Sequence, residues 1–286
     1  MQNLLNNFPL LSPAGFVGEA ELGLMVSAVL FMLIVAVPVY ILLFFFAWRY
    51  RAGNKKAVYK PEWEHAKVDE LIWWAIPFEI ILILGALTWT STHELDPRVP
   101  LEGGPPLVVQ VVALDWKWLF IYPEQNIATV NYVRIPVGRP VRFEVTADAP
   151  MNSFWIPELG GQIYAMTGMV NVLHLIADEA GEFKGKSANY SGVGFAEMKF
   201  VAEAVTPEEF DAWVESISVS ASYLSADTYA LLREQSVAHP REQYAGVESG
   251  LYNSVVTQFS GGMSELNEES RTWPSGPERA LHSVHE

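Results

Sequence analysis

The pattern of apolar residues near the start of the chain predicts two membrane-spanning helices. Leu22–Trp48 is an unbroken run of uncharged residues, roughly 40 Å long as a helix at about 1.5 Å per residue. Leu71–Thr92 is a second apolar run, interrupted only by the charge of Glu79. Both runs are long enough to cross the hydrocarbon core of a bilayer, which is about 30 Å thick. We therefore expect a transmembrane helical hairpin over residues 21–95; these lengths disfavour the alternative, a pair of buried helices in a soluble protein.

Basic residues indicate how this hairpin is oriented. The connector between the two runs carries Arg49, Arg51, Lys55, Lys56, Lys60 and Lys67. The N-terminal tail, residues 1–20, carries no Lys or Arg. Because cytoplasmic loops are enriched in Lys and Arg, we expect the connector in the cytoplasm and both termini on the exterior side.

Beyond the hairpin, the pattern changes to short segments typical of β-strands. Residues 96–106 are rich in Pro and Gly and predict a stiff linker. From Leu107 onward, runs rich in Val, Ile, Phe and Tyr recur between turn residues. The candidate strands are Leu107–Leu114, Trp116–Tyr122, Ala128–Ile135, Val141–Ala147, Ser153–Ile156, Val170–Ala177 and Glu197–Ala204. Strands this short and this closely spaced predict an antiparallel β-sandwich over residues 107–205.

A helical extension is predicted over residues 206–260. Thr206-Pro207-Glu208-Glu209 combines a capping residue, a proline at the first helical position and acids in the first turn. Further helices are expected over residues 225–237 and 249–259. Residues 261–286 are rich in Gly, Ser, Glu and Pro, a composition that predicts disorder.

Charge and cysteine content narrow the possible functions. The formal net charge is −15, and most of it lies beyond residue 95. An acidic domain argues against nucleic-acid binding, which needs basic patches. The acidic surface could attract a basic protein partner or serve solubility alone. The chain has no cysteine, so it has no thiolate for a metal centre or a lipid anchor.

Two further segments are specific enough to indicate a family. Asp115–Gln125 is an aromatic run that, taken alone, would be a strand of the core. Gly185–Met198 has the layout of a loop that surrounds a two-copper centre. Placed after a two-helix hairpin, these segments resemble subunit II of the haem-copper terminal oxidases over about residues 20–260. The resemblance is strongest to the quinol-oxidising branch, such as the bo-type ubiquinol oxidases. It implies that the sandwich is an all-β, cupredoxin-like Greek-key domain.

The same resemblance identifies positions where copper ligands are missing. Relative to the copper-bearing branch, Asn152 stands at the first histidine, Ser187 and Ser191 at the two cysteines, Asn189 at the residue lending a carbonyl, and Phe195 at the second histidine, while Met198 is retained. A two-copper centre needs bridging thiolates and imidazoles. A lone thioether is a weak ligand and an ordinary core side chain. We therefore expect no copper and no other cofactor in this chain.

Two carboxylates in the second span are candidates for a proton pathway. Glu70 lies at the predicted cytoplasmic start of the span, and the resemblance places the matching acid at the mouth of a proton-uptake channel. The alternative is that Glu70 stabilises the positive end of a helix. Glu79 departs from the family, where an apolar residue is expected. Glu79 lies about 13 Å deeper than Glu70 and on the opposite helix face, so we do not expect it to extend the same path directly. Because an ionisable group inside a span is costly, we expect Glu79 to be protonated or hydrogen-bonded and to face a partner or the first span.

Together these features predict an accessory, redox-silent subunit of a proton-pumping ubiquinol:oxygen oxidoreductase. The resemblance implies a bacterial cytoplasmic membrane, with the sandwich in the periplasm. The resemblance also implies two kinds of partner, a catalytic subunit I and further small membrane subunits. Subunit I would hold two haems and one copper and would carry out all the electron transfer. Ubiquinol would act on the complex, and no catalytic residue is expected here. The alternative is a membrane-anchored, cupredoxin-like binding module without oxidase partners.

Overall fold

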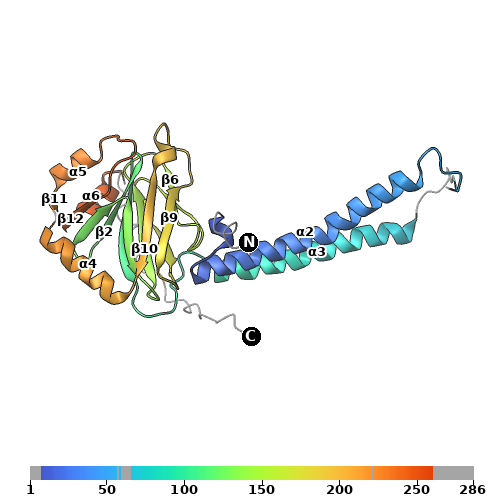
Figure 1. Cartoon of the computed structure of the whole chain (residues 1–286), viewed down its shortest axis with the longest axis horizontal. Helices are drawn as coiled ribbons and strands as arrows, with labels where there is room; N and C mark the ends of the chain where they lie inside the picture. The colour runs from blue at the N-terminus through green and yellow to red at the C-terminus, as the bar shows by residue number, and fades with distance from the viewer. Residues whose placement is uncertain (1–7, 57, 59–65, 221, 260–286) are drawn as a thin grey trace. The chain divides into compact units, whose positions relative to one another are not determined.

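The computed structural model describes residues 8–56, 58, 66–220 and 222–259. The chain divides into two compact units, Gly23–Leu95 and a second unit made of the residues up to Leu22 together with those from Asp96 onward. We call these the hairpin unit and the sandwich unit, and each is described by itself (Figure 1). The segment 261–286, for which disorder is predicted, lies outside the described residues.

The two predicted spans are helices. They are α2 (Phe16–Arg49) and α3 (Lys67–Glu94), and both are long and apolar enough to cross a membrane. Pro38 and Pro77 lie inside them without ending either helix. No residue in the most apolar part of either helix is buried. Such helices are stable only where lipid or another protein covers their apolar surface.

The segment predicted as an N-terminal tail is partly ordered against the sandwich. A short 3-10 helix, η1 (Pro9–Leu11), precedes α2, which begins before the predicted start of the hairpin at residue 21. Ala14 N donates to Glu158 O at 2.8 Å, and Asp178 N donates to Ala14 O at 3.0 Å. At Gly15, a Cβ atom would lie 2.1 Å from the Ile176 carbonyl oxygen, so only glycine permits this approach.

The sandwich unit is built from two sheets (Figure 1). The first sheet has the order β11-β12-β3-β2-β1-β5-β8, and the second has the order β4-β10-β9-β6-β7. The strands of the first sheet are β1 (Leu107–Leu114), β2 (Lys117–Tyr122), β3 (Ile127–Val130), β5 (Val141–Ala147), β8 (Asn171–Leu175), β11 (Ser222–Leu224) and β12 (Glu242–Val247). The strands of the second are β4 (Tyr132–Pro136), β6 (Asn152–Trp155), β7 (Ile163–Ala165), β9 (Gly181–Ser187) and β10 (Lys199–Val205). The predicted β-sandwich is present, but the prediction that it is antiparallel was wrong for three strand pairs, because β1 pairs with β5, β10 with β4, and β11 with β12 in parallel.

The predicted strand Ala128–Ile135 is two strands in different sheets. Asn131 separates β3 from β4 and adopts a left-handed conformation with φ of 59°. Asparagine tolerates this conformation better than most residues do. Its side chain fixes the crossing, since Asn131 Oδ1 accepts from Trp118 N at 3.0 Å and Nδ2 donates to His239 O at 2.8 Å. Apolar and polar residues alternate on both sides of Asn131, so the sequence pattern did not indicate that the strand is interrupted there.

Aromatic side chains fill the space between the sheets. Phe154 and Phe200 stack with ring centroids 5.1 Å apart, and Trp118 meets Phe154 edge-on at 5.4 Å. These three side chains are buried. The ring of Phe200 occupies the place where a side chain at position 185 would lie, so Gly185 completes the packing.

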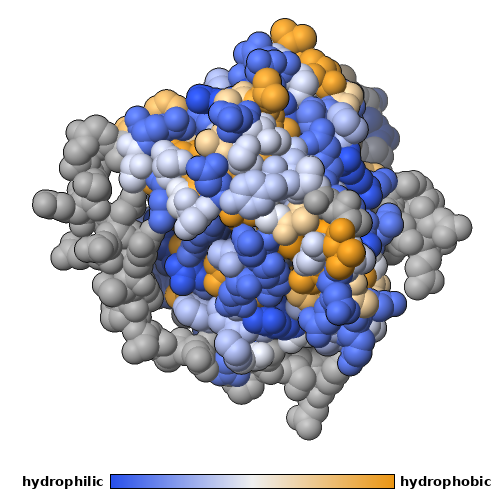
Figure 2. Space-filling model, turned by 90° about the vertical axis from the view of Figure 1, so that its left-hand side faces the viewer, coloured by the Kyte–Doolittle hydropathy of each residue, from blue (hydrophilic) through white to orange (hydrophobic). Residues whose placement is uncertain are grey.

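The C-terminal extension, which was predicted as helical, also supplies strands β11 and β12 to the first sheet, and its last two helices pack against that sheet. Helix α4 (Pro207–Ser220) begins as predicted, with Thr206 Oγ1 accepting from Glu209 N at 3.3 Å and Glu209 Oε2 accepting from Thr206 N at 3.1 Å. The shorter helices α5 (Ala226–Leu232) and α6 (Leu251–Thr257) help to form a second apolar cluster, which includes alternate residues of β2. Every residue of β2 is therefore buried, although one face of an isolated sandwich sheet would be solvated. The outward surface of this end of the unit is largely hydrophilic, with separate hydrophobic groups (Figure 2).

Candidate functional site

The loop at which the resemblance predicts a lost copper site is closed by hydrogen bonds between side chains and backbone. Ser187, at the end of β9, donates from Oγ to Asn152 Oδ1 at 2.9 Å, and Asn152 lies on the adjacent strand β6. Asn152 Nδ2 donates in turn to Pro150 O at 2.7 Å. Asn189 Nδ2 donates to Met151 O at 2.9 Å. Asn152 and Ser187 are 1% and 5% exposed, so their polar atoms are satisfied by one another in the interior.

The second half of the loop packs on Trp116. Trp116 Nε1 donates to Ser191 O at 3.1 Å, and a Cβ atom at Gly194 would lie 2.4 Å from the Trp116 ring. Phe195 begins the 3-10 helix η2 (Phe195–Glu197) and meets the Tyr190 ring edge-on, with centroids 5.6 Å apart. The backbone of this half is thus held by close contact with an indole ring, and no metal ligand is needed to hold it.

Met198 follows η2 and belongs to the apolar core. Its side chain is 1% exposed and lies in the same cluster as Phe154 and Phe200. The retained methionine therefore contributes apolar packing to the sandwich. A thioether in this role needs no metal partner.

The residues present do not fit a two-copper centre. The structure brings Asn152 and Ser187 together and places Asn189, Ser191 and Phe195 on the same loop, as the resemblance implies. These side chains offer an amide, a hydroxyl and an aromatic ring, whereas copper centres of this kind require thiolate and imidazole. Within the part of the chain that the structure describes, no three His, Cys, Asp or Glu residues are grouped so that they could hold a metal ion.

The two carboxylates of α3 occupy different surroundings. Glu70 lies in the first turn, is half-buried, and its backbone N donates to Ala66 O at 2.9 Å. Glu79 lies near the middle of the same helix and is exposed on the surface of the hairpin unit. The structure therefore does not bring the two acids together, in agreement with their helical spacing.

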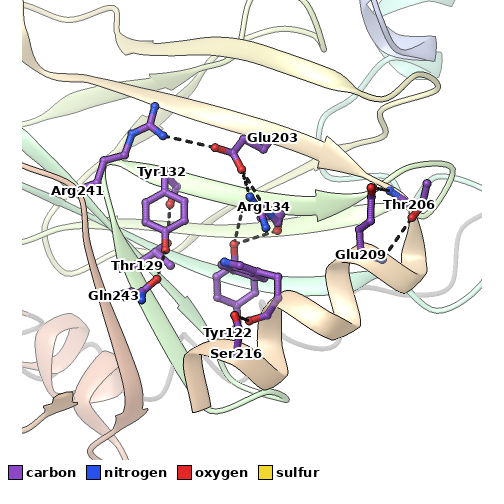
Figure 3. Close-up of polar contacts among 11 residues, drawn as sticks. Tyr122, Thr129, Tyr132, Arg134, Glu203, Thr206, Glu209, Ser216, Arg241 and Gln243 are labelled. Atoms are coloured by element: carbon purple, nitrogen blue, oxygen red, sulfur yellow. Dashed lines mark hydrogen bonds and ion pairs between the residues drawn. The ribbon is translucent and has the colours of Figure 1, made fainter. Parts of the chain in front are cut away.

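A polar cluster that no sequence motif indicates joins both sheets to the C-terminal extension (Figure 3). Arg134 of β4 donates to Glu203 Oε2 of β10 through Nε at 2.9 Å and also through Nη2. The Arg134 guanidinium lies 5.3 Å from the centroid of the Trp213 ring on α4. Arg241, just before β12, reaches Glu203 Oε1 at 3.4 Å. The members of this cluster come from β4, β10, α4 and the loop just before β12, so only long-range contacts reveal it.

The buried carboxylate of Asp148 holds α5 through a hydrogen bond and an ion pair. The side chain of Asp148 is 0% exposed, and it accepts from Tyr229 Oη at 2.7 Å and from Arg233 Nη2 at 3.0 Å. Burial, reinforced by the hydrogen bond to Asp148, raises the pKa of Tyr229 well above its ordinary value. Tyr229 is therefore a neutral donor at physiological pH, which suits a structural role.

Lys117 is a buried lysine on β2. It is 1% exposed, and its Nζ donates to the backbone carbonyl of Glu234 at 2.7 Å. Burial lowers the pKa of Lys117, while the nearby carboxylate of Glu242 and those of other acids oppose this shift. The contact connects the aromatic strand to the segment after α5, so this group also holds the extension in place.

Comparisons with known proteins identify the relatives of this chain. The family described as cytochrome c oxidase subunit II, periplasmic domain, matches residues 122–205. The chain is 50% identical over 256 residues to the cytochrome bo(3) ubiquinol oxidase subunit 2 of Pseudomonas putida, covering 89% of this chain and 82% of that protein. It is 48% identical over 256 residues to the ubiquinol oxidase subunit 2 of Acetobacter aceti, covering 88% of this chain and 83% of that protein.

Among solved structures, the periplasmic domain of cytochrome oxidase subunit II from Bradyrhizobium japonicum aligns with 40% of this chain and 95% of its own, at 24% identity and a TM-score of 0.38. The sequence relatives are far closer and extend over both the helices and the sandwich. Their similarity confirms the cupredoxin-like class of the sandwich and the resemblance derived from the aromatic run and the loop. The chain belongs to the family of subunit 2 proteins of haem-copper quinol oxidases.

Proposed function

We propose that this chain is a redox-silent accessory subunit of a proton-pumping ubiquinol:oxygen oxidoreductase in the aerobic respiratory chain. The observation that carries the proposal is the buried hydrogen bond between Ser187 and Asn152. It joins two positions where the copper-bearing branch has a cysteine and a histidine. The relatives named as ubiquinol oxidase subunits support the same assignment.

The nature of the electron donor explains why this subunit needs no redox centre. A lipid-soluble quinol can reach a catalytic subunit from within the membrane, so no relay in an exterior domain is needed. The two haems and one copper of the reaction then belong to catalytic subunit I. This chain binds no copper, braces subunit I through its helices, and covers it with its sandwich.

The charge distribution supports one orientation in the bacterial cytoplasmic membrane. Arg49 ends α2 and is half-buried, and Arg51 is exposed just after it, in the basic connector between the helices. Under the positive-inside rule, this connector is cytoplasmic. The sandwich and both termini are then periplasmic.

Affinity purification of the tagged full chain from native membranes tests this function. We expect a large haem-bearing subunit to purify with it, and copper analysis to find one copper per complex. A purified chain with neither haem nor a large hydrophobic partner would support the alternative of a membrane-anchored binding module. Three coppers per complex would contradict the redox-silent assignment.

Glu70 provides a test of proton entry through this subunit. We propose that its carboxylate collects protons at the cytoplasmic start of α3, where it is half-buried. Glu70→Ala should slow quinol oxidation by the complex about tenfold, which is less than the loss of a positioned general acid, because protons also enter from bulk water. Steady-state oxygen consumption in proteoliposomes measures the effect.

Asp69→Asn is the matched control, since Asp69 is the other acid in the first turn of α3 and is also half-buried. If Glu70 acted only on the helix dipole, both variants would alter stability slightly and leave turnover unchanged. Equal rates in the Glu70→Ala and Asp69→Asn complexes would therefore eliminate the proton-entry role.

A further inference from the structure

The exposed lysines of the sandwich unit gather on one face of the second sheet. Among the residues that the structure describes, this unit has four lysines, of which Lys117 is buried. The other three, Lys184, Lys186 and Lys199, are exposed on the adjacent strands β9 and β10. The chain as a whole has a net charge of −15. This group of cations is therefore a candidate site for an anion on an otherwise acidic protein.

Two of these lysines repel one another. Lys186 and Lys199 lie directly opposite each other in the antiparallel pair of β9 and β10, and like charges in such a pair are destabilising. Lys199 Nζ lies 3.6 Å from Glu197 Oε2, but both side chains are more than half exposed, so this ion pair is weak. Lys186 forms no ion pair with the acids that the structure describes, and its Nζ lies 4.6 Å from the centroid of the Trp155 ring on β6. An anion between the two ammonium groups would therefore relieve a repulsion that the protein otherwise retains.

The same two lysines line a pocket of about 340 Å³. This volume lies at the lower end of the range for sites that bind small molecules. The other lining residues are Trp155, Ser187, Ala188, Phe195, Ala196 and Met198. Three of them, Ser187, Phe195 and Met198, stand at positions that the resemblance assigns to copper ligands. The pocket thus combines ammonium groups with aromatic rings and methyl groups.

Hydrogen bonds hold the walls of this pocket in place. Trp155 Nε1 donates to Gly160 O at 3.1 Å, which fixes the indole ring. Ser187 N donates to Met198 O at 3.1 Å, and Met198 N donates to Phe195 O at 3.1 Å. These bonds connect β9 to η2, so a ligand would not have to order the loop. A preformed site of this kind loses less conformational entropy on binding.

We propose that this pocket binds a small aromatic anion, such as an aryl carboxylate or an aryl phosphate. The negative group of the ligand lies between Lys186 and Lys199, and its ring lies against the apolar side chains of Trp155 and Phe195. A protein partner would require a much larger contact surface than this pocket provides. The inference goes beyond the proposed function, because it requires neither a haem-bearing subunit nor electron transfer.

Calorimetric titration of the full chain in detergent with phenyl phosphate tests the inference. A ligand of this size is expected to bind with a Kd of about 1 mM. Lys186→Gln and Lys199→Gln should each weaken binding about threefold to tenfold, between the effects of an exposed ion pair and of a buried charged hydrogen bond. Lys184→Gln is the matched control, since Lys184 is exposed on β9 but does not line the pocket. Its Kd should stay near the native value.

Inorganic phosphate and phenol are the comparison ligands. Inorganic phosphate lacks the ring and phenol lacks the charge, so both should bind more weakly than phenyl phosphate. Equal binding of inorganic phosphate would indicate an adventitious ion only, and equal binding of phenol would indicate an apolar pocket without an anion site. Either result, or the absence of saturable binding, overturns the inference.

Acetylation of the lysines, located by mass spectrometry, provides a second measurement. Phenyl phosphate should protect Lys186 and Lys199 from acetylation but leave Lys184 reactive. Equal protection of all three would indicate general screening of charge and would contradict a defined site. These measurements use the chain without its partners, so a preparation that lacks haem would contradict the proposed function and leave the binding result unchanged.

Discussion

Replacing Gly185 with alanine is expected to destabilise the sandwich unit by about 3 kcal/mol, at the upper end of the usual cost of overpacking a core. A Cβ atom at this position would lie 2.1 Å from the nearest atom of the Phe200 ring. That ring cannot retreat easily, because it is 3% exposed and stacks on Phe154 with centroids 5.1 Å apart. Urea unfolding of the full chain in detergent, followed by tryptophan fluorescence, measures the loss.

Gly181→Ala is the matched control for this variant. Gly181 lies on the same strand, β9, but a Cβ atom there would meet its nearest neighbour, the Phe183 ring, at 3.5 Å. That is ordinary van der Waals contact, so little change in stability is expected. A second test combines Gly185→Ala with Phe200→Leu, which shortens the obstructing side chain and should recover part of the loss. Equal stabilities of the two alanine variants would contradict this account of the packing.

Replacing Asp148 with alanine is expected to cost about 3 kcal/mol, the low end for breaking a buried ion pair. The variant leaves the buried hydroxyl of Tyr229 without its acceptor and removes the ion-pair partner of Arg233. The loss stays at the low end because the Arg233 side chain is 45% exposed and can be solvated. The expected structural consequence is release of α5 from the first sheet, so limited proteolysis should cut the chain after β10 sooner.

Glu124→Gln is the control for Asp148→Ala, because it removes the charge of an acid that is exposed on the surface. Glu124 is 54% exposed and lies 4.0 Å from Arg139, so this surface pair should contribute less than about 1 kcal/mol. Tyr229→Phe should lose only one hydrogen bond, about 1 kcal/mol. If Asp148→Ala were no more destabilising than Glu124→Gln, the buried carboxylate would not be what holds α5.

The elements that sequence predicted well are those with local causes. Helix α4 began where Thr206 and Glu209 form reciprocal caps, because both partners lie within one turn. Strand β9 was missed, because it buries only Phe183, Gly185 and Ser187 and so shows little apolar periodicity. Strand β3 was joined to β4 in the prediction, because the break depends on one left-handed asparagine held by distant backbone groups.

The site shows the same division. The lost ligand positions were predicted from the resemblance, which is carried by contiguous segments around Asn152 and Ser187, and they stay a prediction. The hydrogen bond between Ser187 and Asn152 could not be predicted from the sequence, because it joins positions 35 apart in the chain. The contacts of Glu203 and of Asp148 could not be predicted from the sequence for the same reason, since each acid binds residues from distant segments of the chain.

The sequence by itself determined the two apolar spans, the capped helix, the family and the lack of thiolate, because each depends on residue identity or on neighbours within a few positions. Only the tertiary structure decided that Asn152 and Ser187 satisfy one another, that β2 is buried on both faces, and that Glu79 is exposed on the hairpin unit. Those outcomes depend on which distant segments meet. They are set by packing and hydrogen bonding summed over the whole fold, which local patterns along the chain do not encode.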